Sequence, residues 1–143
     1  MNHIHNIDLI SKVVIGQFDG LKNKYGFKDY ESKKGTDSIN ISIGLNDVII
    51  EAYINEREGV RILYRKRSWP EFKKRDFMSF LGLKFNNDFE KEEQFLRDFL
   101  TPRVKLEDFS YEFYEHFLSK ELEFVEKNFP GVFTKGVLDG FEK

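Results

Sequence analysis

The residue types that most often carry chemistry are sparse in this chain of 143 residues, which has three histidines and no cysteine. His3 and His5 have a His-x-His spacing, and an extended chain would place both imidazoles on one side, where they could ligate a metal. No third ligand lies near them in the sequence. We therefore expect no metal site at this end of the chain.

A second candidate is the pair Glu112 and His116, which are four residues apart. On a helix this spacing places a carboxylate and an imidazole on one face, an arrangement suited to acid–base or metal chemistry. Lys120, Glu123 and Lys127 share the same polar arc, where charged side chains one turn apart form pairs. We favour the second interpretation, a solvent-exposed helix face stabilised by such pairs.

Motifs with a dedicated chemistry are absent from the sequence. It has no glycine-rich phosphate loop, no Gly-x-Ser-x-Gly nucleophile elbow and no His-Glu-x-x-His zinc helix. Its carboxylates are scattered among lysines instead of being paired in an apolar setting that would shift their pKa values. The sequence thus predicts a protein that is not an enzyme, with no catalytic residue, no cofactor and no metal.

Charge is distributed unevenly, although the net charge is only −2. Residues 56–75 hold eight basic residues against three acidic ones, and residues 107–126 hold seven acidic residues against Lys120 alone. These segments are either two oppositely charged solvated elements of one domain or a charged surface for a partner. A pI near 6.0 argues against nucleic acid, because phosphate contacts usually require a basic protein.

The element that must position these side chains is an antiparallel meander over residues 38–66. Isoleucines alternate with polar residues from Ile39 to Ile43, which is the period of a strand with one buried face. Asn46-Asp47 suits a two-residue hairpin loop. This loop predicts three apolar pairs: Leu45 with Val48, Ile43 with Ile50, and Ile41 with Ala52.

A second loop over residues 57–59 would place Gly59 in the left-handed conformation and join the second strand to the third. The register that follows predicts these cross-strand pairs: Glu56 with Val60, Ile54 with Ile62, Ala52 with Tyr64, Tyr53 with Leu63, and Glu51 with Arg65. Both faces are complementary in this register. The isoleucine face must then pack against helices.

The other face of the meander mixes polar, charged and apolar residues: Asn40, Ser42, Ile49, Glu51, Tyr53, Arg61, Leu63 and Arg65. It is either an ordinary solvated face or a binding surface, and scattered exposed apolar residues favour the former. If it binds a partner, the residues we expect to carry binding are Tyr53, Arg61, Leu63, Arg65 and Arg67, because Arg and Tyr often anchor interfaces. The acidic C-terminal helix could instead cover this basic surface.

Helices are expected before and after the meander in the sequence. Apolar residues spaced three and four apart predict an N-terminal helix over about 6–25 that ends at Gly26. Gly16 and Gly20 within it indicate either close approach by a neighbouring element or a weak point. Residues 27–33 could add a leading strand. Three further helices are predicted. The first lies within 69–82 and is capped by Ser68 or Asp76. The second covers about 88–100, with Phe89 facing inward, and the third covers about 110–128.

Length and composition indicate one α+β domain over residues 1–133, followed by a loose tail over residues 134–143. The fold class is an N-terminal helix, a three- to four-stranded antiparallel meander, and two to three C-terminal helices packed on one sheet face. No basic leader and no long uncharged apolar run appears, so we expect a soluble cytoplasmic protein without a membrane partner.

This order of elements resembles small stand-alone bacterial proteins that include immunity proteins of polymorphic toxin systems. The resemblance is carried by Ile39-Asn-Ile-Ser-Ile43, by Glu58-Gly59-Val60-Arg61, by Asp76-Phe77 with Phe80-Leu81, and by the closing segment 118–133. It implies a protein that neutralises a cognate toxin by binding it, and it assigns no functional residues.

We therefore expect a non-catalytic binding protein whose partner is another protein, a toxin or a regulatory partner. The alternative is an unrecognised small enzyme or a nucleic-acid-associated regulator. Genomic context separates the two: a toxin-domain gene immediately upstream favours immunity, and a metabolic operon favours an enzyme.

Overall fold

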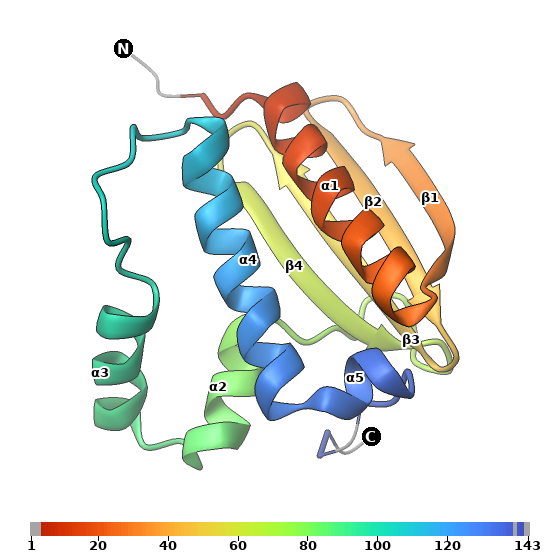
Figure 1. Ribbon diagram of the computed structural model, residues 1–143. Coiled ribbons are helices and arrows are strands. Elements are labelled where there is room, and N and C mark those ends of the chain that lie inside the picture. Colours follow the sequence, from red (N-terminus) through yellow and green to blue (C-terminus); the bar gives the residue numbers. More distant parts are fainter. Residues whose placement is uncertain (1–3, 139, 142–143) are drawn as a thin grey trace.

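The computed structural model describes residues 4–138, 140 and 141 of the chain. One four-stranded antiparallel sheet carries α1 (Ile7–Tyr25) across one face, and α4 (Tyr111–Asn128) packs beside α1 (Figure 1). The remaining helices are α2 (Phe77–Phe85), α3 (Phe89–Phe99) and α5 (Pro130–Thr134). The α+β class and the predicted order of elements are confirmed.

The strands follow one another in space as they do in sequence: β1 (Lys28–Lys34), β2 (Ser38–Leu45), β3 (Val48–Asn55) and β4 (Gly59–Lys66). The β2–β3 register has all three predicted pairs, Leu45 with Val48, Ile43 with Ile50, and Ile41 with Ala52. Asn46 adopts the left-handed conformation that a two-residue loop requires, with φ 50°. The leading strand expected over residues 27–33 is present as β1, shifted by one residue; it lies at the sheet edge, and each of its residues is exposed.

The β3–β4 register differs from the prediction by two residues. Ile54 lies opposite Val60 rather than Ile62, and Asn55 lies opposite Gly59. The reason is the Asn55 side chain, whose Oδ1 accepts hydrogen bonds from the backbone N–H groups of Arg57 and Glu58 and so begins the turn one residue early. Because a shift of two preserves the alternation, every side chain stays on its predicted face.

Helix α1 ends at the predicted Gly26 and begins after Asn6, a cap for which no residue was predicted. The Asn6 side chain accepts a hydrogen bond from the Leu9 N–H, and Gly26 ends the helix with φ 86°. Its apolar stripe packs on the isoleucine face of the sheet, and Phe18 and Ile41 are among the most buried residues of the core. Neither Gly16 nor Gly20 lies against a backbone of another element, so the prediction of close approach is wrong.

The helices beyond the sheet resolve one ambiguity of the sequence and correct one expectation. Asp76, and not Ser68, caps α2, because its carboxylate accepts from the Ser79 N–H at 3.1 Å. Helix α3 starts after the cap Asp88 and packs through Phe95. Phe89 was expected to face inward, but it is 76% exposed because it occupies the first turn, before α3 reaches the core.

The chain after α5 packs on the molecule, which differs from the loose tail expected over residues 134–143. Leu138 and Phe141 are buried, and Phe141 meets Phe80 edge to face. The carbonyl of Gly136 accepts a hydrogen bond from the Asp47 N–H, so this segment is held against the β2–β3 turn. Asp139, Glu142 and Lys143 lie outside the described residues. No helix in the described part of the chain has the length and apolarity needed to cross a membrane.

Candidate functional site

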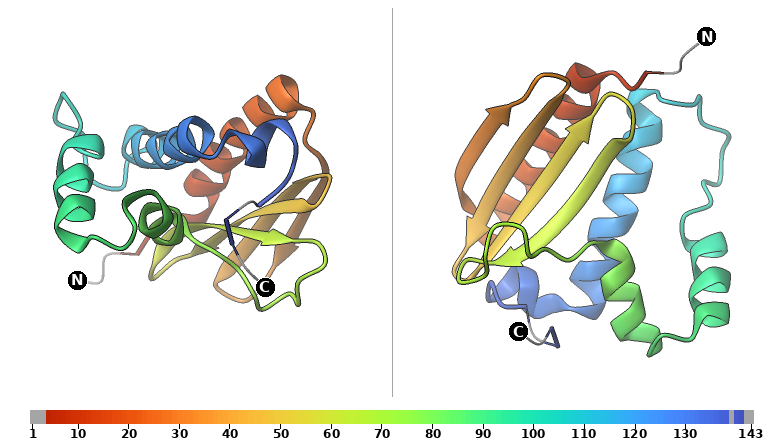
Figure 2. Two further views of the ribbon diagram at one scale, coloured as in Figure 1. Left: turned by 90° about the horizontal axis from the view of Figure 1, so that it is seen from below. Right: turned by 180° about the vertical axis from the view of Figure 1, so that it is seen from behind.

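The five residues predicted to bind a partner lie on one surface, the face of the sheet opposite α1, which we call the outer face. Tyr53 pairs with Arg61 across β3 and β4, and Leu63 and Arg65 follow on the same side of β4. Viewed from behind, this face of the sheet is not covered by any helix of the described chain (Figure 2). The segment between β4 and α2 lies over part of this face, since Lys74 contacts Glu51 and Glu71 lines a shallow hollow with Ser42 and Ile49 (Figure 2).

Arg65 on this face has an internal role. It pairs at 3.4 Å with Glu51, whose second oxygen lies 2.6 Å from Lys74 Nζ. The Glu51 residue is only 5% exposed. A buried carboxylate costs several kcal/mol unless cations compensate it, so Arg65 and Lys74 are required by the fold.

The other two arginines of the predicted set are also paired. Arg61 Nη2 lies 3.3 Å from Asp76, and Arg67 Nη2 lies 3.0 Å from Asp29. Arg67 reaches Asp29 by crossing over Gly44, where a Cβ would overlap its guanidinium. The acids that neutralise this surface therefore come from the sheet and the α2 cap, and not from the acidic C-terminal helix.

Much of the remaining basic charge in residues 56–75 gathers around one indole ring. Lys73 Nζ lies 4.6 Å and Arg75 Cζ lies 5.2 Å from the Trp69 ring centroid. Trp69 is 9% exposed, so these cations cover it in the turn between β4 and α2. This cluster stabilises the turn and leaves no aromatic platform for a ligand.

The chain matches no protein-family model, no curated protein and no solved structure.

The two histidines in the described part of the chain, His5 and His116, join neighbouring segments by hydrogen bonds. His5 hydrogen-bonds the Tyr114 hydroxyl through Nδ1, and its backbone N–H donates to the Glu56 carbonyl at 2.7 Å. His3 lies outside the described residues. His116 Nε2 lies 2.9 Å from the Leu100 carbonyl, which ties α4 to the chain after α3, whereas Glu112 is exposed. Within the described part of the chain, no group of three His, Cys, Asp or Glu residues could hold a metal ion.

A cleft that contains Glu121 was not predicted from the sequence. A cleft of about 270 Å³ opens at the edge of β4, between that strand and α2, α3 and α4. Burial, together with the nearby carboxylate of Asp76, raises the pKa of the Glu121 carboxyl in this cleft to about 7. The expectation that no carboxylate would be shifted is therefore wrong for Glu121.

One sequence signal could have revealed Glu121. It lies three residues after Leu118 and four before Val125, so it interrupts the apolar stripe of α4 with a carboxyl group. Both leucine and valine are buried. A lone acid at such a position is either paired inside the core or exposed to a cavity.

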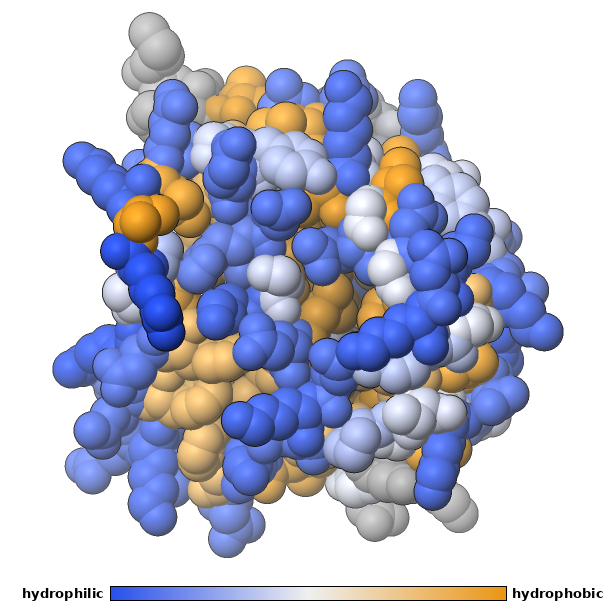
Figure 3. Space-filling model, viewed as in Figure 1, coloured by the Kyte–Doolittle hydropathy of each residue, from blue (hydrophilic) through white to orange (hydrophobic). Residues whose placement is uncertain are grey.

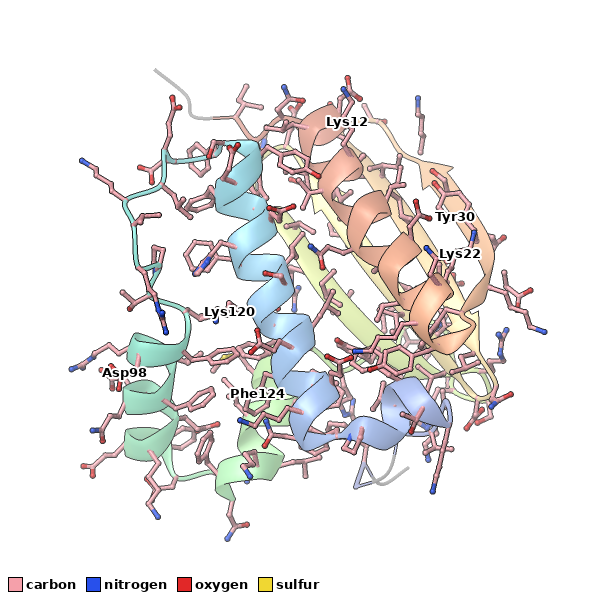
Figure 4. The ribbon with its side chains drawn as sticks, viewed as in Figure 1. Lys12, Lys22, Tyr30, Asp98, Lys120 and Phe124 are labelled. Carbon is pink, nitrogen blue, oxygen red and sulfur yellow. The ribbon has the colours of Figure 1, made fainter. Side chains whose placement is uncertain are left out.

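Helix α3 forms the far wall of this region. It packs on α4 through aromatic rings, with Phe95 and Phe124 centroids 5.2 Å apart, and Phe124 projects from α4 in Figure 4. Lys120 lies beside Phe99, 5.3 Å from its ring centroid. Figure 3 shows apolar atoms gathered where α3 meets α2 and α4. The cleft therefore has apolar walls, and its carboxyl groups come from α4 and the α2 cap.

Proposed function

We propose that this protein is a non-catalytic binding protein whose outer face docks on another protein, in the manner of an immunity protein that neutralises a toxin by direct binding. The observation that supports this proposal is that no helix of the described chain lies over the outer face of the sheet (Figure 2). A sheet face without a helical layer is a rigid surface, and rigidity lowers the entropy cost of association.

The composition of the outer face suits a protein interface. Ile49 and Tyr53 lie on either side of Glu51 on β3, and Leu63 lies opposite Glu51 on β4. All three apolar or aromatic side chains are half-buried. Arg61 lies beside them with a side chain that is 56% exposed. An apolar and aromatic centre with a charged rim is the usual anatomy of a specific interface.

The arginines of the outer face are paired with carboxylates, and this limits the charge of the partners that the face can attract. Because Arg61, Arg65 and Arg67 each have a carboxylate within 3.4 Å, the outer face presents ion pairs rather than free positive charge. Long-range attraction of an acidic partner is correspondingly weak. We propose that the partner is recognised by shape and by the Tyr53 and Leu63 side chains. On binding, Arg61 would leave Asp76 and pair with a carboxylate of the partner.

The test compares two tyrosines that are replaced by the same residue. Tyr53→Lys alters the centre of the outer face, and Tyr30→Lys alters β1 at the sheet edge, where Tyr30 is 48% exposed. The partner is recovered from the native host with the wild-type protein, and its affinity for each variant is measured. Loss of a central anchor should weaken binding by roughly 30-fold or more, while Tyr30→Lys should bind as the wild type does.

The immunity function has its own readout. The protein is co-expressed with the product of the gene immediately upstream, and growth is followed. Protection by the wild type and by Tyr30→Lys, but not by Tyr53→Lys, supports the proposal. Equal affinity and equal protection by both variants, or turnover of a metabolite by a wild type that recovers no partner, would refute it.

A further inference from the structure

The cleft at the edge of β4 has an unbalanced set of charged groups. It is lined by side chains from β4, α2, α3 and α4: Val60, Arg61, Ile62, Asp76, Phe77, Met78, Leu96, Leu100 and Glu121. Two of its polar groups, Arg61 and Asp76, pair with each other at 3.3 Å. Glu121 has no hydrogen-bond or ion-pair partner within the described chain.

Both carboxylate oxygens of Asp76 already have partners, so Asp76 is not available to bind a further group. One of its oxygens accepts hydrogen bonds from the N–H and the hydroxyl of Ser79 as the α2 cap, and the other oxygen faces Arg61. The Arg61 guanidinium is thereby held on the Asp76 side of the cleft. Two titratable groups lie near Glu121, the Asp76 carboxylate and the Tyr64 hydroxyl of β4. Neither supplies positive charge, so the negative charge of Glu121 is uncompensated whenever it is ionised.

We infer that this cleft binds an alkylammonium group carried on an apolar arm. The ammonium would pair with Glu121, and the arm would lie along Ile62, Met78 and Leu96. A six-carbon arm with its nitrogen needs roughly 200 Å³ at about 30 Å³ per heavy atom, which the cleft of about 270 Å³ accommodates. An anionic ligand would meet two carboxyl groups against one guanidinium, so the charge of the cleft selects against it.

Binding and ionisation of Glu121 are linked. A cation favours the carboxylate, so binding below about pH 7 must displace the Glu121 proton. As pH increases toward 7, the affinity for the ammonium group should rise about tenfold per pH unit, and above pH 7 it should become constant. A ligand held by apolar contacts alone would show no such dependence.

Met78 provides a local probe for the experiment. The chain has two methionines, Met1 and Met78, and Met78 lines the cleft with 51% of its surface exposed. Labelling of methionine methyl groups therefore gives two NMR signals, which a Met78→Leu variant assigns. Hexylammonium is titrated to millimolar concentration, with 1-hexanol as the neutral control and hexanoate as the anionic control.

The expected result is a saturable shift of the Met78 signal with hexylammonium, stronger at about pH 8 than at about pH 6, and at least tenfold weaker binding of hexanol and hexanoate. Glu121→Gln should abolish the charge preference and the pH dependence. Glu115→Gln, which alters an exposed acid of the same helix, should change neither. Thermal unfolding of each variant confirms that it folds.

One further ligand distinguishes the source of the ammonium group. Nα-acetyl-lysine methylamide, whose side-chain ammonium is free, represents a lysine of a partner protein, and hexylammonium represents a free amine. Tighter binding of the lysine derivative assigns the cleft to a protein partner, and tighter binding of the amine assigns it to a small molecule. Absence of a Met78 shift, an equal shift with hexanol, or an unchanged affinity between about pH 6 and pH 8 would overturn the inference. The two proposals are tested at different residues, because Glu121 and Met78 line the cleft and Tyr53 does not.

Discussion

Arg65 and Glu51 form an ion pair across β3 and β4 although they are not directly opposite each other. Glu51 lies opposite Leu63, and Arg65 lies opposite Ile49, so the pair is diagonal. Long side chains reach diagonal neighbours about 7–8 Å apart, and Arg65 uses this reach to meet a buried carboxylate. The pair therefore joins the two strands beneath the outer face.

The diagonal pair predicts unequal effects of two arginine substitutions. Arg65→Ala should lower the free energy of unfolding by about 2–3 kcal/mol, because Glu51 stays buried with Lys74 as its one remaining partner. Arg61→Ala removes an exposed pair and should cost less than about 1 kcal/mol. Urea denaturation of both variants measures the difference. Equal losses would show that Glu51 is solvated in solution.

Glu121 predicts a stability that depends on pH. Its pKa is about 7 in the folded protein against 4.5 for an ordinary glutamate, so the folded state holds the proton more tightly. The stability that this group contributes is fully present below about pH 4.5 and is lost as pH rises through 7. Glu121→Gln should therefore be more stable than the wild type by roughly 2–3 kcal/mol at about pH 8, and close to it at about pH 4.5.

The control for Glu121 is Glu115→Gln, which should differ little from the wild type at either pH because Glu115 is exposed. Denaturant midpoints are measured for all three proteins across the pH range. A wild type and Glu121→Gln variant whose difference stays constant with pH would mean that Glu121 titrates as an ordinary surface acid.

Gly136 is the residue that allows the C-terminal segment to dock. It has φ 65°, and a Cβ at this position would overlap the backbone carbonyl of Leu45. Gly136→Ala should destabilise the domain by about 3 kcal/mol or more, since backbone cannot move aside as a side chain can. Gly20→Ala, in an open helical position, should instead stabilise it by up to about 1 kcal/mol. Thermal unfolding measures the stability of both variants. Similar melting temperatures for Gly136→Ala and Gly20→Ala would show that Gly136 does not pack against the Leu45 backbone.

Ile41 tests the packed face of the sheet. It is fully buried at the centre of β2, so Ile41→Asp should cost several kcal/mol and unfold a domain whose total stability is about 5–15 kcal/mol. Ile15→Asp makes the same change on α1, where Ile15 is 37% exposed, and should leave a folded protein. Circular dichroism and NMR spectra report the outcome. A cooperatively folding Ile41→Asp variant would show that this face is not core.

Elements whose signals lie within a few residues were determined by the sequence itself. The β2–β3 register follows from Asn46-Asp47 and the alternating isoleucines, and α1 lies between the local signals Asn6 and Gly26. These features depend on backbone conformations and caps that involve only neighbouring residues. The faces of the sheet follow for the same reason, because alternation survives a register shift of two.

Tertiary structure decided the features that depend on residues distant in the chain. Tyr64 is bridged to Arg75 beyond β4, and Gly136 docks on the β2–β3 turn some 90 residues earlier in the sequence. The environment of Glu121 is of the same kind, since β4, α2 and α3 enclose a carboxyl group that belongs to α4. Desolvation and charge pairing act through space. The pKa of an acid, and whether an arginine is paired with a carboxylate, are therefore fixed only when the folded chain brings their neighbours together.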